Sequence, residues 1–396
     1  MMLENNHIYK TERASTSITR IFGLGGELMY LVEGSKEAML IDTGVGEGNL
    51  KALVEELTSK HVKVLLTHGH LDHAAGIDGF AEIYMNSLDE YTFDGHMDIT
   101  QRQDFLKSKN CPPEVLDELR EVNKPDFIDV REGDTFDLGG ITLEIFEVPG
   151  HTPGSIAILF QEERILLLGD CCNTFTFLLD EYSPTVETYK RNLKKLLNKV
   201  EGRYEQVFIS HRTGMVSQRI LHTVIDVCDL VMEGKSAQKP YHFLHRAGLV
   251  AVMTDNLNRR LDGKEGNIVY WQNKIFDEVK GFIIVVAGER LSERVQNGMR
   301  QIEKAGFPIC VLEDDYLEPQ IFIKAAKHLG ISTLSCVVAT SSLQGIDAAK
   351  AVSCKVIAVG DACGYYRADA EVQDFSEIIQ FAKNPPVLNI PPHMPL

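Results

Sequence analysis

The chain carries, at the end of an apolar run that begins at Val62, the segment Thr67-His68-Gly69-His70-Leu71-Asp72-His73-Ala74-Ala75-Gly76. His68 and His70 are two residues apart, so in extended backbone their side chains point to the same side and can hold one ion. Asp72 and His73 follow where the chain is expected to turn into a helix, and we expect them to point towards a second ion. Imidazole and carboxylate are ligands for Zn²⁺, and a mixed set also suits Fe or Mn. The segment therefore predicts a metal site at the end of a strand.

This segment resembles the HxHxDH signature of the metallo-β-lactamase superfamily, whose fold is shared by glyoxalase II, lactonases and several nucleases. Residues that match the rest of the family pattern lie between positions 15 and 215: Asp42 in Leu40-Ile41-Asp42-Thr43-Gly44, His151 in Pro149-Gly150-His151-Thr152-Pro153-Gly154-Ser155, Asp170 after Leu168-Gly169, and His211 after Val207-Phe208-Ile209-Ser210. The resemblance implies two metal sites and an αββα sandwich, with every ligand following a strand at one edge. It assigns the ligands as His68, His70 and His151 for the first site, Asp72, His73 and His211 for the second, and Asp170 as the bridge.

Each of the later matches has an ordinary structural explanation when taken alone. His151 stands among Pro-Gly and Thr-Pro-Gly turn residues, Asp170 could cap a turn, and His211 could be a half-buried polar residue. Their joint order and spacing favour the metal site. We interpret Asp42 as a residue that orients the histidine loop without binding metal.

A centre with two divalent cations and a bridging hydroxide is typical of hydrolases. Bound cations polarise a carbonyl or phosphoryl oxygen and lower the pKa of bound water from about 15.7 to around 7. Asp72 and Asp170 are the predicted catalytic residues, because they are placed to handle the proton of a metal-bound hydroxide. Residues 150–155 resemble the glyoxalase II and lactonase branch, which implies a small ester, thioester or lactone as the substrate. No basic cluster resembling the glutathione-binding residues of glyoxalase II is found near the expected C-terminal helices of this domain.

Three other functions stay open from the sequence. The first is a mononuclear iron sulfur-oxygenase of the persulfide dioxygenase kind, against which the complete second ligand set argues. The second is a phosphodiesterase, because the same hydroxide attacks phosphorus. The third is a binding protein with a structural metal, although structural zinc sites are normally closed and single.

Pocket-lining residues are harder to predict than the ligands. Tyr91, Phe93, Phe175 and Tyr182 are candidates for an apolar pocket beside the metal edge, although packing under loops explains them equally well. Among the histidines that match no ligand position, His96 and His242 are the ones expected nearest to the pocket. Cys171 and Cys172 adjoin Asp170, but we interpret them as small buried side chains.

Length, charge and cysteine content set the wider frame. The 396 residues predict two domains, because domains typically contain about 100–200 residues. The net charge of −17 argues against nucleic acid or an anionic membrane as the partner, so a small-molecule substrate is expected. Eight cysteines without a CxxC pair indicate reduced thiols, and no signal-peptide pattern is visible at the start. These features predict a cytoplasmic protein.

In the first 280 residues, strand-like runs alternate with turn signals and a few helical patterns. Runs at 18–22, 28–33 and 38–42 predict an antiparallel meander. Helices are expected over 50–57, 114–122 and 185–200. Many strands with interspersed helices suggest two sheets covered by helices, an αββα layering.

The last third alternates strictly between strands and helices. Apolar runs begin at Phe282, Pro308, Ser335 and Lys355, with helical patterns at 292–305, 319–329 and 343–352 between them. This alternation predicts a parallel, Rossmann-like α/β domain. The expected units are residues 1–275, residues 281–384 and a Pro-rich tail at 385–396.

Residues 318–330, 343–351 and 368–372 resemble the haloacid dehalogenase superfamily, nearest to its β-phosphoglucomutase type. The chemistry of that family is not retained: Glu318 stands in place of its lysine, and Thr340 and Ser341 replace its acidic magnesium ligands. The first strand has Val285 and Ala287 where the nucleophile pair of aspartates belongs. The resemblance therefore implies a catalytically inactive domain that serves docking, ligand sensing or homodimer formation.

Overall fold

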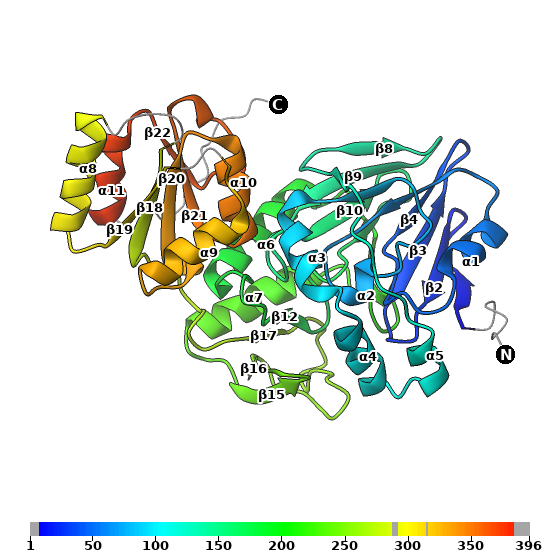
Figure 1. Ribbon diagram of the computed structural model, residues 1–396. Coiled ribbons are helices and arrows are strands. Elements are labelled where there is room, and N and C mark those ends of the chain that lie inside the picture. The colour runs from blue at the N-terminus through cyan, green and yellow to red at the C-terminus, as the bar shows by residue number, and fades with distance from the viewer. Residues whose placement is uncertain (1–7, 287–291, 314–315, 384–396) are drawn as a thin grey trace. The chain divides into compact units, whose positions relative to one another are not determined.

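The computed structural model describes residues 8–286, 292–313 and 316–383. The chain divides into two compact units, Met1–Phe276 and Asp277–Leu396, each with its own hydrophobic core (Figure 1). The expected Pro-rich tail and position Ala287 lie outside the described residues. Within the described ranges, no helix has both the length and the apolar character needed to cross a membrane.

The N-terminal unit is built on two sheets. The first has the order β1-β2-β3-β4-β5-β6-β7, with bounds β1 (Lys10–Arg13), β2 (Ile18–Phe22), β3 (Leu28–Glu33), β4 (Ala38–Ile41), β5 (Val62–Leu65), β6 (Ile83–Met85) and β7 (Ile128–Asp129). Strands β2 to β4 pair antiparallel, which confirms the predicted meander, and β4 to β7 pair parallel. The second has the order β14-β13-β11-β10-β9-β8, with bounds β8 (Thr135–Asp137), β9 (Thr142–Glu147), β10 (Ile156–Phe160), β11 (Ile165–Leu167), β13 (Gln206–Phe208) and β14 (Met215–Val216).

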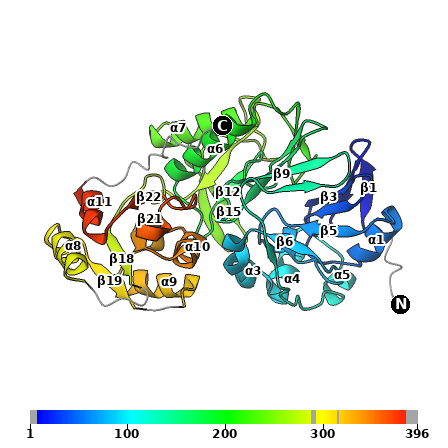
Figure 2. The same cartoon turned by 90° about the horizontal axis from the view of Figure 1, so that it is seen from above.

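Alternating side chains let each sheet bury both faces. In β3, Tyr30 belongs to the core between the sheets, whereas its neighbours Met29 and Leu31 belong to the core under the helices. The helices that pack on the first sheet are α1 (Leu50–Leu57), α2 (Leu71–Ala74), α3 (Glu90–His96), α4 (Ile99–Ser108) and α5 (Pro113–Asp117). On the second sheet, α6 (Val186–Val200) and α7 (Ile220–Met232) lie side by side (Figures 1 and 2). The unit is therefore an αββα sandwich, as the motif resemblance implied.

One predicted helix was too long. The segment expected to be helical over 114–122 forms only α5, which ends at Asp117. The buried Arg102 guanidinium donates to the carbonyl of Arg120 at 2.6 Å, where a helix would supply a backbone N–H. Pro125 also has no N–H for a carbonyl one turn earlier.

A third, small sheet was not predicted. Its order is β12-β17-β16-β15, with bounds β12 (Thr176–Leu178), β15 (Lys239–Phe243), β16 (Arg246–Val250) and β17 (Ile268–Tyr270). β15 and β16 form a hairpin in which Phe243 pairs with Arg246 across a two-residue turn. These strands are short, and β15 exposes every second residue, Pro240 and His242, so they lack the long apolar runs by which buried strands are recognised.

The C-terminal unit is a parallel sheet of order β19-β18-β20-β21-β22. Its strands are β18 (Gly281–Val285), β19 (Ile309–Leu312), β20 (Cys336–Thr340), β21 (Lys355–Val359) and β22 (Ala370–Val372). Helices α8 (Glu293–Lys304) and α11 (Ile379–Lys383) lie on one side of the sheet, and α9 (Pro319–His328) and α10 (Leu343–Ala351) on the other (Figures 1 and 2). This confirms the Rossmann-like architecture, while the resemblance to haloacid dehalogenases stays a prediction.

Candidate metal centre

The seven predicted ligands follow strands at one edge of the sandwich. His68 and His70 lie on the loop after β5, and Asp72 and His73 occupy the first turn of α2, directly behind that loop. The other three, His151, Asp170 and His211, follow β9, β11 and β13. Those three strands run in the same direction, because β10 is antiparallel to both β9 and β11, and β11 is parallel to β13. Their carboxyl ends therefore open at the same edge of the second sheet.

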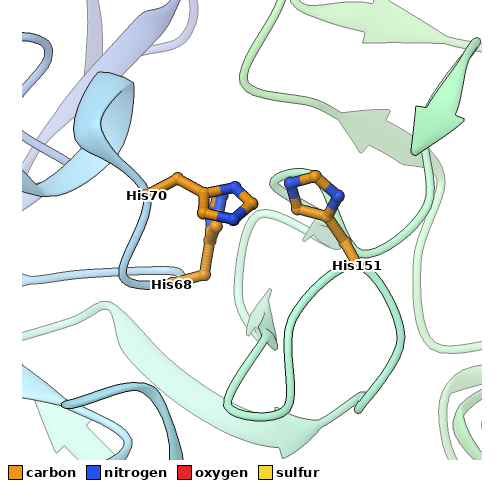
Figure 3. A group of neighbouring side chains, drawn as sticks. All are labelled: His68, His70 and His151. Atoms are coloured by element: carbon orange, nitrogen blue, oxygen red, sulfur yellow. The ribbon is translucent and has the colours of Figure 1, made fainter. Parts of the chain in front are cut away.

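His68, His70 and His151 form the first group. Each offers one ring nitrogen, and these atoms all lie within 4.8 Å of one another. Two of the imidazoles come from one loop and the third from a loop facing it, and the rings converge (Figure 3). Their centroids are 4.5–4.9 Å apart. This spacing leaves room for a cation between the rings.

The second group is Asp72, His73 and His211. Asp72 Oδ2 lies 3.7 Å from His73 Nε2 and 3.6 Å from His211 Nε2. Asp170 Oδ2 faces both groups, at 3.0 Å from His211 Nε2, 3.7 Å from His73 Nε2 and 3.8 Å from His151 Nε2. The structure thus brings all seven side chains together, with Asp170 between the two groups.

Backbone and side-chain oxygens fix the orientation of the imidazoles. The Nδ1 atom of His151 bonds the Phe177 carbonyl at 2.7 Å, and that of His73 lies 2.9 Å from Asp42 Oδ2. His211 Nδ1 is 3.3 Å from the Gly26 carbonyl. With Nδ1 engaged in this way, Nε2 points into the centre. Asp42 also accepts the Thr67 N–H at 2.7 Å, so it orients the loop, as the sequence suggested.

Unsatisfied nitrogens indicate what the centre is suited to hold. The Nε2 atoms of His68 and His73 are fully buried and have no hydrogen-bond partner in the described structure. A buried polar atom without a partner costs about 1–3 kcal/mol, so such atoms are rare unless a ligand or ion satisfies them. Neutral imidazoles and carboxylates are zinc ligands. The donor set therefore fits a pair of divalent cations.

The electrostatics of the centre divide its histidines into two kinds. Burial and the nearby His70 lower the pKa of His151 to about 4, and burial with His73 holds the pKa of His68 well below its usual value. Burial also acts to lower the pKa of His73, but Asp72 and Asp42 outweigh it and raise that pKa to about 10. Without bound metal ions, the proton on the His73 imidazole offsets the negative charge of the neighbouring carboxylates. A metal ion that binds His73 must displace this proton, since only a deprotonated ring nitrogen is a ligand.

A buried carboxylate that the sequence did not single out joins the two histidine loops. Asp89 accepts the Gly69 N–H at 2.7 Å on the first loop. It also accepts the Thr152 hydroxyl at 2.7 Å and the Gly154 N–H at 2.6 Å on the second. A Cβ at Gly69 or Gly154 would come within 2.7 Å of Asp89 backbone atoms, so glycine is required at both positions. Asp89 therefore sets the separation of His70 and His151.

Asp89→Asn is expected to destabilise the N-terminal unit by about 2–3 kcal/mol, because an amide oxygen replaces a charged acceptor and its NH₂ group meets an N–H donor. Urea unfolding of the chelated protein measures the change without a contribution from metal. The matched control is Asp94→Asn on α3, an exposed carboxylate expected to change stability by less than about 0.5 kcal/mol. Equal stabilities for the two variants would contradict this role for Asp89.

A second missed carboxylate, Asp180, contacts the first histidine group from outside. Its Oδ2 lies 2.5 Å from His70 Nε2, which leaves His70 Nδ1 for the centre. Arg246, from the β15–β16 hairpin, forms an ion pair with Asp180 Oδ1. His96 stacks on His70 with centroids 4.3 Å apart. Asp180 and His70 are 110 positions apart in the chain, so their pairing gives no local sequence signal. Of the residues around Asp180, His96 was expected near the pocket from the sequence.

A cavity of about 580 Å³ opens over the centre. His96 and Phe175 line it, as the sequence suggested, but Tyr91, Phe93, Tyr182 and His242 do not. Phe93 is buried against Phe127, and Tyr91 meets Tyr182 edge to face with ring centroids 5.6 Å apart. Those aromatic side chains therefore stabilise loops, which was the alternative explanation.

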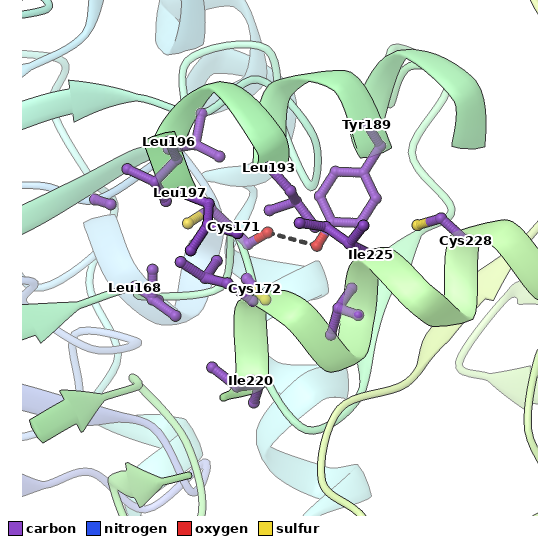
Figure 4. Close-up of a cluster of buried hydrophobic side chains, with 14 of the residues drawn as sticks. Leu168, Cys171, Cys172, Tyr189, Leu193, Leu196, Leu197, Ile220, Ile225 and Cys228 are labelled. Carbon is purple, nitrogen blue, oxygen red and sulfur yellow. Dashed lines mark hydrogen bonds between the residues drawn. The ribbon is translucent and has the colours of Figure 1, made fainter. Parts of the chain in front are cut away.

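Cys171 and Cys172 contribute to the core rather than the centre. Both are buried beneath α6 and α7, where the Tyr189 hydroxyl donates to the Cys171 carbonyl at 2.8 Å (Figure 4). Burial raises the pKa of the Cys172 thiol to about 12, so it stays protonated and is a poor ligand. None of the eight cysteines is in a disulfide.

Comparison with known proteins agrees with this geometry. Residues 22–204 match the family described as the metallo-beta-lactamase superfamily. The chain is 29% identical over 144 residues to the hydroxyacylglutathione hydrolase GloC of Haemophilus influenzae, covering 35% of this chain and 62% of that protein. It is 26% identical over 213 residues to the acyl-coenzyme A thioesterase MBLAC2 of Gallus gallus, covering 48% of this chain and 74% of that protein.

Among solved structures, a metallo-beta-lactamase from Pontibacter korlensis aligns with a TM-score of 0.42 at 16% identity, covering 55% of this chain and 97% of that one. The chain spans only 53–62% of the length of the first three curated relatives that it matches. The relatives named above are hydrolases by name.

Proposed function

We propose that this chain is a dinuclear metal-dependent hydrolase of the metallo-β-lactamase superfamily, whose family model matches residues 22–204, and that it acts on an ester, thioester or lactone. The observation that carries the proposal is the convergence of a three-histidine group and an Asp/His/His group with Asp170 Oδ2 between them. Zinc is the proposed metal, with iron or manganese as alternatives, because the donors are imidazole and carboxylate only.

Two sets of donors support two cations. His68, His70 and His151 would hold one, Asp72, His73 and His211 the other, and Asp170 would bridge. When bound, such cations polarise a carbonyl oxygen and make a bound water acidic enough to ionise near pH 7. A mononuclear iron oxygenase would not use the second set of donors. Asp42 and Asp72 both contact His73 in that set, and this arrangement favours a second metal site.

Asp170 and Asp72 are the proposed catalytic carboxylates. Asn173 Nδ2 donates to Asp170 Oδ1 at 3.2 Å, which fixes the carboxylate and leaves Oδ2 directed into the centre. Oδ2 is therefore the atom that would accept the proton of the attacking water. Asp72, on the first turn of α2, faces the same space from the opposite sheet and is the alternative acceptor. Whichever carboxylate takes the proton would return it to the leaving group as the bond to the acyl carbon breaks.

The relatives support the choice of bond. Two of them are named for thioester hydrolysis or for hydrolysis of hydroxyacylglutathione. The C-terminal unit, with Thr340 and Ser341 at the end of β20, is proposed to be non-catalytic.

The test is a panel of substrates given to zinc-, iron- and manganese-loaded protein: a thioester, a lactone, a phosphodiester and a persulfide. We expect hydrolysis of the thioester or lactone with the zinc or manganese form. Oxygen consumption with the persulfide by a single-iron form would favour the oxygenase instead. Phosphodiester cleavage alone would move the proposal to phosphodiesterase chemistry.

A further inference from the structure

An aromatic wall lines one side of the cavity over the metal centre. It consists of Phe175, Phe177, Tyr241 and Phe243, contributed by β12, the loop before it and β15. Phe177 stacks on Phe243 with centroids 5.2 Å apart, and Phe175 meets Tyr241 at 5.1 Å. The rings therefore form one continuous apolar surface, as apolar substrate groups require.

This wall is joined to the metal centre through one residue. The backbone carbonyl of Phe177 holds His151 Nδ1 at 2.7 Å, while the Phe177 ring belongs to the wall. An acyl group that extends away from a carbonyl carbon held at the centre can therefore pass directly onto the rings. The wall ends at the β15–β16 hairpin, where Phe243 lies.

Two basic side chains, Lys109 and Arg212, line the same cavity, and neither pairs with a carboxylate among the described residues. Lys109 Nζ lies 5.8 Å from the centroid of the Phe243 ring, and Arg212 directly follows His211. Both side chains are exposed. By contrast, Arg246 in the same cavity is paired with Asp180. Arg212 donates a hydrogen bond to the Leu257 carbonyl at 3.3 Å. Since no described carboxylate pairs with either side chain, the charges of Lys109 and Arg212 can attract an anionic group of a substrate.

The carboxylates of the cavity wall have partners of their own, which offset part of their charge. Asp98 accepts the Gln101 N–H and caps α4, and Asp104 pairs with Lys107 at 3.1 Å. Asp72 and Asp170 face the proposed cations. Charges at an exposed rim act mainly by steering a substrate, and salt screens them.

We propose that the substrate is an anionic thioester with a long apolar acyl group, whose acyl chain packs on the aromatic wall and whose charged leaving group is attracted by Lys109 and Arg212. This inference rests on the proposed hydrolysis at the metal centre. It assigns the two halves of the substrate to separate sets of residues, so each can be tested without the other.

The experiment is a two-by-two comparison of thioesters on the zinc-loaded protein. Acetyl and decanoyl groups are each joined to coenzyme A, which carries phosphates, and to N-acetylcysteamine, which is neutral. We expect kcat/KM to be at least about tenfold higher for decanoyl than for acetyl thioesters, since several methylenes become buried. We also expect about tenfold higher kcat/KM for the coenzyme A thioesters at low salt, with the difference falling as salt is added.

Variants separate the two contributions. Phe243→Ala is expected to lower the decanoyl preference about tenfold and leave the coenzyme A preference unchanged, with Phe243→Leu intermediate. The double variant Lys109→Ala/Arg212→Ala is expected to lower the coenzyme A preference about tenfold, mainly by raising KM, and to leave the decanoyl preference unchanged. Lys235→Ala, an exposed lysine outside the cavity, is the control and should match the parent. Circular dichroism verifies that each variant is folded.

The outcomes distinguish this inference from the proposed function. Turnover of all four thioesters with similar kcat/KM, unaffected by the variants, would overturn the substrate assignment and leave hydrolysis intact. A short-acyl or neutral preference would overturn it as well. No turnover of any thioester, with turnover of a lactone or simple ester retained, would overturn the substrate assignment and leave the proposed hydrolysis standing. No turnover of a thioester, lactone or ester by protein that holds its metal would contradict the proposed function itself.

Discussion

Asp170→Asn is expected to lower kcat by about 10³-fold or more while the protein stays folded. Asp170 Oδ2 is the atom that faces both groups of ligands, and an amide there neither accepts a proton readily nor bridges two cations. Losing several kcal/mol of transition-state stabilisation gives a rate loss of this size, since about 1.4 kcal/mol corresponds to tenfold. Steady-state kinetics on metal-loaded protein, with the thioester panel, measures the effect.

The control for this substitution is Asp226→Asn on α7, where the carboxylate is exposed and outside the cavity. That variant should keep the parent kcat. His70→Ala is expected to give a loss comparable to that of Asp170→Asn, because both remove a donor of the same centre. A kcat for Asp170→Asn within tenfold of the parent would mean that catalysis occurs elsewhere.

Removal of metal is expected to lower the melting temperature of the N-terminal unit by roughly 10 °C. A ligand present at a thousand times its dissociation constant stabilises the folded state by about 4 kcal/mol. For a unit of this size, each kcal/mol shifts the midpoint by about 2–4 °C. The donors come from loops after β5, β9, β11 and β13, so cations would join both sheets. Differential scanning calorimetry with and without a chelator measures the shift.

Two observations make this second prediction specific. Added zinc should restore the transition, and His70→Ala should show a much smaller response to the chelator. A transition of the C-terminal unit, which contributes no donor to the centre, should not move. An unchanged midpoint in the parent protein would indicate that the two groups hold no tightly bound cation.

The sequence predicted the parts of the structure that depend on short-range order. Residues 67–76 place two histidines at alternating positions and then begin a helix, and the structure has this arrangement at the end of β5. The helix expected over 50–57 has those same bounds, and strand–helix alternation was enough to predict the C-terminal sheet. These features follow from periodicity within a few turns of chain, which one sequence reveals directly.

The sequence did not predict features that depend on contacts between distant residues. Asp89 and Asp180 are single carboxylates without a motif, and their roles come from partners on other loops. The aromatic wall joins residues 175–177 to 241–243, and the two unpaired cations are Lys109 and Arg212, which are far apart in the chain. Folding brings these two charges to one cavity from separate segments, so they form no cluster in the sequence.

Counting the metal ions bound to each chain tests the central claim most directly. The purified protein is saturated with zinc and then freed of excess metal. Elemental analysis should then give about two zinc ions per chain for the parent protein. His70→Ala and Asp170→Asn should each hold fewer, and the control Asp226→Asn should hold two. A parent protein that retains no transition metal, or retains one ion that neither substitution removes, would contradict a dinuclear centre built from these seven side chains.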